Sequence, residues 1–246
     1  MMNDSTNNLV IDVGNTLTKL AIFSGNKLLE VEKVDSVHLA DIQQLVNRYG
    51  IKNAIISSVA SMPANCQEYL VNNGNLVLFS STMPLPIKNS YSTPETLGSD
   101  RVAAAVAANL LYPNSNVLVV DSGTALTYEV ITSNAEYLGG AISPGITMRF
   151  KSLNNYTSKL PLLNITNNYP IIGSSTVDSI WSGVLNGIVN EVDAYIDSLK
   201  IDYPQLKIVF TGGDAFFFDK KLKNSIFVHP NLVLIGLNRI LNYYNE

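Results

Sequence analysis

The strongest indication of the fold is the segment LVIDVGNT, residues 9–16, in which a short apolar run ends at an aspartate and a glycine. A run of this kind predicts a buried strand that leads into a turn. In residues 17–23 apolar and polar side chains alternate sufficiently to predict the returning strand. Gly25-Asn26 marks a second turn before a third strand over residues 27–34. The start of the chain is therefore expected to be a strand–turn–strand unit with a polar corner.

The same unit occurs a second time in the chain. Residues 117–120 are VLVV and run into DSGTALT, residues 121–127, which resembles DVGNTLT at residues 12–18. Both copies consist of an apolar strand, the pattern Asp-x-Gly, a small polar residue and a β-prone run. A duplication of this kind predicts two similar lobes, each presenting a loop of Asp, Gly and Thr to a shared cleft.

Alternating helix and strand patterns fill the rest of the sequence. Helices are predicted at residues 38–49, 98–112, 175–199 and 232–244, strands at 51–58, 128–131, 137–142 and 207–210, a helix–strand pair at 65–79, and a long loop at 81–97. The expected fold class is α/β, with mixed sheets flanked by helices. The N-terminal lobe is expected over residues 1–112 and the C-terminal lobe over 113–246, with a terminal helix able to pack back on the first lobe.

Composition and charge exclude several classes of protein. The 246 residues carry 16 Lys and Arg against 20 Asp and Glu, and this net charge of −4 lacks the basic footprint of a nucleic-acid-binding protein. A single cysteine, Cys66, excludes an intramolecular disulfide framework and a cysteine-built zinc site. His38 and His229 lack the spacing of metal ligands. Without a leader pattern or an apolar run near about 20 residues, the protein is expected to be cytoplasmic, with no membrane partner.

The two Asp-x-Gly loops suit phosphate binding. Glycine lets the backbone approach a phosphate closely, and neighbouring Asn and Thr side chains donate hydrogen bonds to its oxygens. An aspartate would instead hold hydrated Mg²⁺, orient water or act as a base, while Lys19 could neutralise phosphate charge. A single copy is most often an ordinary turn. Two matched copies and a third glycine turn, TGG at residues 211–213, favour phosphate binding, although the sequence holds neither a Walker-type P-loop nor GxGxxG.

The paired loops resemble the phosphate loops of the superfamily that unites acetate and sugar kinases, heat-shock ATPases and actin. More narrowly, the sequence resembles the type III pantothenate kinases. This narrower resemblance rests on YxxPxxLGSDR at residues 91–101, GGAIxPG at 139–145, LP at 160–161 following Thr157, TGGDA at 211–215 and PxLVLxGL at 230–237. The segments occur in order and span almost the whole chain.

The resemblance implies two actin-like (ribonuclease H-like) lobes with ATP in the cleft between them. It also implies ATP-dependent phosphorylation of the terminal hydroxyl of pantothenate, the first step of coenzyme A synthesis. Asp100 would be the catalytic base, which agrees with the need to deprotonate a primary hydroxyl. Arg101 would pair with the carboxylate of pantothenate. Considered without the resemblance, Asp100-Arg101 is a helix-start carboxylate beside a surface arginine.

The resemblance assigns further residues to three sites. The ATP and phosphate site would comprise Asp12, Gly14, Asn15, Thr16, Lys19, Gly123 and Thr124. The pantothenate pocket would comprise Tyr91, Gly98, Ser99, Arg101 and Thr176. The metal sites would comprise Asp12, holding Mg²⁺ or a similar divalent ion through water, and Asp121, at a monovalent cation such as K⁺ or NH₄⁺. A homodimer with its active site near the interface is also implied, although Thr176 alone is typical of a helix N-terminus.

Three positions depart from the family pattern: Ser99 and Ser122, where alanine is common, and Glu129, where aspartate is usual. The extra methylene of Glu129 would change the geometry of any ligand or metal that it positions. Two other functions stay open. One is a catalytically inactive regulatory or accessory protein of the same fold, and the other is a kinase of the superfamily acting on a sugar or acetate.

Overall fold

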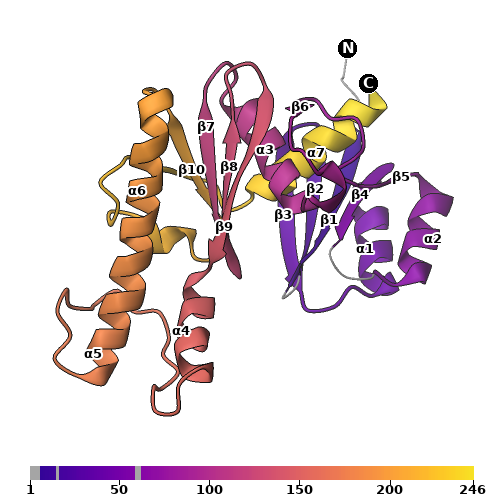
Figure 1. The fold of residues 1–246 in the computed structure, drawn as a ribbon. Helices are drawn as coiled ribbons and strands as arrows, with labels where there is room; N and C mark the ends of the chain where they lie inside the picture. Colours follow the sequence, from indigo (N-terminus) through magenta and orange to yellow (C-terminus); the bar gives the residue numbers. More distant parts are fainter. Residues whose placement is uncertain (1–5, 15–16, 59–61) are drawn as a thin grey trace. The chain divides into compact units, whose positions relative to one another are not determined.

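The computed structural model describes residues 6–14, 17–58 and 62–246 and divides into two compact units. Unit 1 comprises Met1–Leu111 together with Leu232–Glu246, and unit 2 comprises Tyr112–Asn231. The expected α/β class, with two mixed sheets flanked by helices, is confirmed (Figure 1). The terminal helix, α7 (Leu232–Asn245), belongs to unit 1 rather than to the unit that precedes it in sequence.

The sheet of unit 1 has the strand order β3-β2-β1-β4-β5. Its first half is the antiparallel meander predicted at the start of the chain, formed by β1 (Asn7–Val13), β2 (Thr18–Ser24) and β3 (Lys27–Val34). The strands β4 (Asn53–Ser58) and β5 (Asn75–Leu78) are added in parallel after the helices α1 (Leu39–Tyr49) and α2 (Ala64–Asn73). Leu9, Val10 and Ile11 of the central strand β1 are fully buried, so both faces of this strand are covered.

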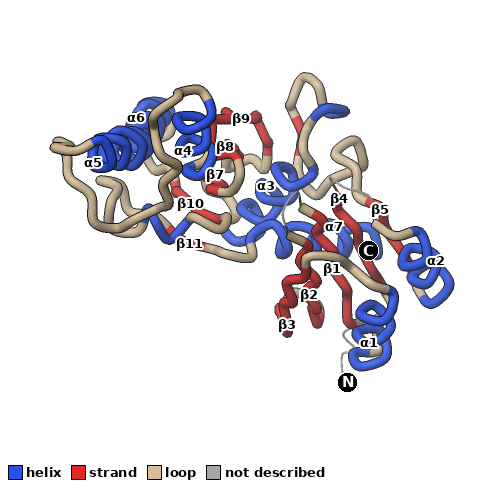
Figure 2. The backbone as a smooth tube through the Cα atoms, turned by 90° about the horizontal axis from the view of Figure 1, so that it is seen from below, coloured by secondary structure: helices blue, strands red, loops and turns tan. Residues whose placement is uncertain are grey.

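The two faces of this sheet are covered by different helices. Leu9 and Ile11 share one core with Ile42 of α1 and Leu70 of α2. Since successive strand residues point to opposite faces, Asn8 points the other way, and its side-chain amide donates to residues of α7. Figure 2 shows α1 and α2 on one side of these strands and α3 (Ser99–Leu111) on the other.

Helices α3 and α7 approach each other unusually closely. A Cβ atom placed on Gly236 of α7 would lie 1.8 Å from the backbone oxygen of Ala103 in α3. The facing surface of α3 is largely alanine, which leaves room for this approach, and Ala103, Ala104, Ala105, Ala107 and Ala108 are all buried. The backbones of α3 and α7 are therefore in direct contact at Ala103 and Gly236.

The sheet of unit 2 repeats the same design. Within this unit the order is β11-β10-β7-β8-β9, formed by β7 (Val117–Ser122), β8 (Ala125–Ile131), β9 (Glu136–Pro144), β10 (Lys207–Thr211) and β11 (Phe227–Val228). The strands β7, β8 and β9 form an antiparallel meander, and β10 joins β7 in parallel. The duplicated unit read from the sequence is thus duplicated in the structure.

The helices of unit 2 depart in two places from the sequence expectation. Helix α4 (Ile146–Asn155) was not predicted, and the helix expected over 175–199 consists of α5 (Thr176–Trp181), a π-helical turn η2 (Ser182–Asn186) and α6 (Gly187–Asp202). All of them contribute to one core with β7 and β8. Shorter elements are β6 (Lys88–Asn89), η1 (Pro94–Thr96) and η3 (Ala215–Phe218).

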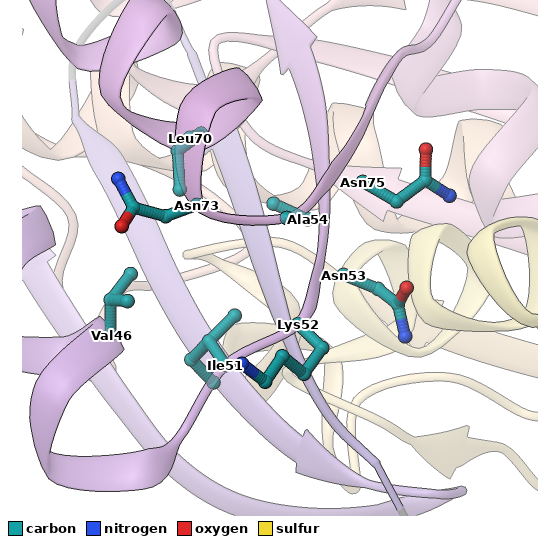
Figure 3. Close-up of a pocket in the computed structure, with 9 residues that line it drawn as sticks. Val46, Ile51, Lys52, Asn53, Ala54, Leu70, Asn73 and Asn75 are labelled. Carbon is teal, nitrogen blue, oxygen red and sulfur yellow. The ribbon is translucent and has the colours of Figure 1, made fainter.

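A small cavity lies inside unit 1 among α1, β4, α2 and β5 (Figure 3). It is lined by side chains that include Val46, Ile51 and Leu70, and its volume is about 10 Å³. This is room for about one water molecule, so the cavity is a packing feature and not a ligand site. Among the described residues, no helix is both long and apolar enough to cross a membrane.

Candidate functional site

The corner between β1 and β2 places an acid opposite a base. Asp12 and Lys19 are register partners on these antiparallel strands, and Asp12 is also the register partner of Ser57 on β4. At the ends of these two strands, the Gly14 N–H donates to the Leu17 backbone oxygen at 3.2 Å. Asn15 and Thr16, also predicted for this corner, lie outside the described residues.

Burial makes Asp12 an unusual carboxyl group. Its pKa is raised to about 6, chiefly because burial disfavours the charged form. The ammonium of Lys19 opposes this rise, and the carboxylate of Asp100 adds to it. Asp12 and Asp100 are 88 positions apart in the sequence, yet their carboxyl groups interact electrostatically inside unit 1.

The start of α3 gathers most of the predicted pantothenate residues. Asp100 is exposed in the first helical turn, and one of its oxygens accepts the Arg101 backbone N–H at 2.8 Å. A Cβ on Gly98 would lie 2.6 Å from that oxygen, so glycine leaves this carboxylate accessible. The guanidinium carbon of Arg101 lies 5.5 Å from the centre of the Tyr91 ring. Arg101 is only 8% exposed, so the interpretation of it as a surface arginine is wrong.

Ser57 belongs to this region and was not predicted. Its hydroxyl oxygen lies 2.9 Å from that of Ser99, the first residue of α3, and Ser57 is only 2% exposed. The available signal was its position at the carboxyl end of a parallel strand, next to the strand that carries Asp12.

Three segments of unit 2 meet at the end of β7. The Gly123 N–H donates to Ala125, the Gly145 N–H donates to Thr124 at 3.2 Å, and the Asp214 N–H donates to Ser122 at 3.0 Å, in each case to the backbone oxygen. Gly212 has φ 93°, a left-handed conformation that favours glycine. The third glycine turn of the sequence thus lies against the second Asp-x-Gly loop.

Asp121 lies in the middle of these glycines. A Cβ on Gly212 would lie 2.4 Å from an Asp121 carboxylate oxygen, and one on Gly123 would lie 3.7 Å from it. Asp214, which was not assigned a role from sequence, has its pKa raised by burial. The hydroxyl of Ser122 is fully buried and has no hydrogen-bond partner among the residues that the structure describes. The carboxylate of Asp121 and the backbone oxygen of Ser122 therefore lie close against the Gly212 backbone.

Glu129, the departure from the family pattern, lies inside unit 2. It is fully buried, and it accepts a hydrogen bond from the hydroxyl of the equally buried Tyr137 at 2.5 Å. The longer glutamate side chain is thus accommodated by a tyrosine on the adjacent strand.

Thr176 is the first residue of α5 and is exposed. The helix cap is the preceding residue, Ser175, whose hydroxyl accepts the Asp178 N–H at 3.1 Å. Thr176 lines a groove of about 930 Å³ in unit 2, together with Arg149, Leu153, Leu160 and residues 173–175 among others. The other predicted pantothenate residues, Tyr91, Gly98, Ser99 and Arg101, belong to unit 1.

The donor set around Asp12 fits a hydrated divalent ion. Mg²⁺ is usually held by one or two carboxylates together with substrate phosphates and water. The raised pKa of Asp12 shows that the protein alone stabilises its negative charge poorly, and a cation would offset this deficit. In the described part of the chain, no group of three or more His, Cys, Asp or Glu side chains could hold a metal ion.

Two mixed sheets flanked by helices, each with an Asp-x-Gly corner, define the class of this protein as α/β, with a fold that solved sugar kinases share. A glucokinase of the ROK family from Streptomyces griseus aligns with 96% of this chain and 99% of its own at TM-score 0.53 and 12% identity. A candidate Baf family transcriptional activator from Campylobacter jejuni aligns with 96% of this chain and 98% of its own, at TM-score 0.60 and 22% identity. These likenesses establish the fold.

Sequence relatives identify the family. The family model described as type III pantothenate kinase matches residues 8–198. A type III pantothenate kinase from Phocaeicola vulgatus is 46% identical over 97% of this chain and 99% of its own length, and one from Bacteroides fragilis is 44% identical over 97% and 98%. The chain belongs to the type III pantothenate kinase family.

Proposed function

We propose that this protein transfers phosphate from ATP to pantothenate, with Asp100 as the base and the two Asp-x-Gly loops as the phosphate sites. Family membership makes it a kinase that phosphorylates pantothenate in coenzyme A biosynthesis. The observation that carries the residue roles is the pairing of Asp12 with Lys19 across β1 and β2, together with the electrostatic effect of Asp100 on the Asp12 carboxylate.

Asp100 is suited to accept the proton of the attacking hydroxyl. Its carboxylate is exposed at the start of α3, and Gly98 leaves the approach to it open. A base in this position removes the proton as the pantothenate oxygen attacks phosphorus. Asp12 is the poorer base, because it would share its charge with Mg²⁺ held through water. That ion, when bound, neutralises the charge of the phosphates.

Arg101 and Tyr91 are suited to hold the other end of pantothenate. The guanidinium of Arg101 presents a planar pair of donors, which matches a carboxylate better than an ammonium does. Its burial against the Tyr91 ring fixes the direction of that fork. Gly98 and Ser99 would complete this side of the pocket.

The remaining predicted residues would bind phosphate and cations. Gly14 and Lys19 from the first corner, with Asn15 and Thr16, would contact phosphate oxygens, and Gly123 and Thr124 would do so from the second loop. Asp121, enclosed by glycines, would hold a monovalent cation, K⁺ or NH₄⁺, with oxygen atoms of the same loop. The nearby hydroxyl oxygen of Ser122 is buried without a hydrogen-bond partner among the described residues, and a bound cation would give this oxygen a partner.

A homodimer would use the groove that contains Thr176. Large apolar side chains close in sequence to its lining residues are exposed, with Ile171 at 78%, Ile172 at 84% and Tyr156 at 89%. Exposed apolar side chains of this size are typical of an interface. A second copy of the chain covering this face would bring Thr176 to the interface.

The test is ADP release by purified protein with ATP and Mg²⁺, in K⁺ or in Na⁺ alone, with pantothenate, glucose or acetate as acceptor. We expect turnover with pantothenate only, and only with K⁺. Turnover in both salts would exclude a requirement for K⁺, and turnover with glucose would indicate a sugar kinase. A folded protein inactive with every acceptor would support the regulatory alternative. The matched variant Asp100→Asn should reduce kcat by about 100-fold or more, and a normal kcat would exclude Asp100 as base.

A further inference from the structure

A pair of serines joins the two parts of unit 1 that carry the acidic site residues. Ser57 lies near the end of β4 and is the register partner of Asp12 on β1. Ser99 is the first residue of α3 and directly precedes Asp100. Their hydroxyl oxygens are 2.9 Å apart, and Ser57 is 2% exposed. One partly buried hydrogen bond therefore links the strand that pairs with β1 to the first turn of α3.

The orientation of Asp100 depends on this first turn. Its carboxylate accepts the backbone N–H of Arg101, and the Val102 N–H donates to the Gly98 backbone oxygen at 3.3 Å. A shift of Ser99 would therefore move the Asp100 carboxylate together with the backbone that holds it. Further along the helix, the close packing of Gly236 against Ala103 holds the body of α3 on α7. The serine bond acts at the end of the helix where the carboxylate lies.

We propose that Ser57 is a positioning residue for phosphoryl transfer, which holds Asp100 at its working distance from Asp12 through the hydroxyl of Ser99. The proposal rests on the proposed role of Asp100 as base. Ser57 itself contacts neither substrate in this account. Its contribution is to keep the carboxylate in line with a hydroxyl that attacks a phosphate bound at the corner of β1. Small errors in such an alignment slow the reaction without weakening the binding of either substrate.

The test compares Ser57→Ala, Ser99→Ala and the double variant with the parent protein. We expect Ser57→Ala to lower kcat by about 10-fold, with KM for ATP and pantothenate changed by less than about 2-fold. Ser99→Ala should lower kcat by the same factor, and because Ser99 also belongs to the proposed pantothenate pocket, only its kcat and its KM for ATP are compared. The double variant should be no slower than the slower single variant, because both changes remove the same hydrogen bond. Ser198→Ala is the matched control, since Ser198 donates to a backbone oxygen on the exposed side of α6 in unit 2.

Several outcomes would overturn this inference. An unchanged kcat in folded Ser57→Ala, effects of the two single changes that multiply in the double variant, or a rise in KM that accounts for the whole loss would each do so. If Ser57→Ala does not fold, the kcat of Ser99→Ala, a change at a partly exposed position, provides the test. A parent protein with no pantothenate turnover, or a fully active Asp100→Asn variant, would overturn the proposed function first and this inference with it. If the parent protein is active and Asp100→Asn is impaired, an unchanged kcat in Ser57→Ala contradicts only the role proposed for Ser57.

Discussion

Single residues of the site derive their properties from surroundings that are distant in sequence. Asp12 is an ordinary aspartate of a strand end, and its raised pKa follows from burial and from Asp100. Arg101 follows Asp100 directly, yet its exposure is 8% and its guanidinium lies over Tyr91. The chemistry expected of each side chain is therefore set by its neighbours in space.

Replacing Asp12 by Asn should stabilise the fold at neutral pH while removing activity. The folded protein keeps the Asp12 proton up to about pH 6, whereas the unfolded chain releases it near pH 3.8. The folded protein therefore loses stability as the pH rises between these two values. Above pH 6, Asp12→Asn should raise the free energy of unfolding by up to about 3 kcal/mol. Urea denaturation at pH 4 and pH 8 measures this, and an equal effect at both values would contradict the assignment.

Replacing Arg101 by Lys should affect pantothenate more than ATP. Lysine keeps the positive charge and loses the planar pair of donors. We expect KM for pantothenate to rise by about 10-fold or more, with KM for ATP nearly unchanged. Steady-state kinetics with each substrate varied in turn measures the split. An equal rise in both constants would indicate that Arg101 supports the site as a whole.

At the scale of elements, the two antiparallel meanders and the parallel strands added to them follow directly from the sequence pattern. The π-helical turn η2 and helix α4 do not. The residues Ile146, Phe150 and Leu153 of α4 have helical spacing and pack into the core of unit 2, but the helix is short and begins at a Pro-Gly pair. Its face is recognisable only once the core that it covers is known.

Replacing Gly236 by Ala should destabilise unit 1. The added Cβ would lie 1.8 Å from the backbone oxygen of Ala103, so α3 and α7 must separate. We expect a loss of about 3 kcal/mol, at the upper end of overpacking effects. Gly187→Ala in α6 is the control, because a Cβ there meets nothing within 4 Å. Denaturant unfolding of both variants measures the difference, and equal stabilities would show that the helices are not in backbone contact.

At the scale of the whole molecule, the chain leaves unit 1 after Leu111 and returns to it at Leu232. Unit 2 is thus an insertion between α3 and α7, the two helices that pack on each other in unit 1. The sequence shows no Gly/Ser linker at either crossing. Within unit 2, the hydroxyl of Tyr112 and Nε2 of His229, which lie near the two ends of this unit in sequence, are 2.8 Å apart.

The proposed dimer gives a prediction at this scale. Replacing both Ile171 and Ile172 by Asp should convert a dimer into a monomer, because charge on a buried apolar face disfavours association. Ile201→Asp is the control, since Ile201 is 80% exposed at the end of α6. Light scattering after size exclusion measures the mass. A parent protein that is monomeric at working concentrations would contradict the dimer, and a dimer that survives the double change would place the interface elsewhere.

Local patterns in the sequence were sufficient for the fold class, the duplicated corner and most of the strands and helices, because apolar periodicity and glycine turns act over a few residues. The same patterns pointed to the β1–β2 corner, whereas the roles of the residues at the α3 start were implied only by the family resemblance. They were insufficient for the bond between Ser57 and Ser99, for the burial of Arg101 and for the pKa of Asp12. Those properties depend on which distant segments pack together, and burial and electrostatic interactions exist only after the chain has folded.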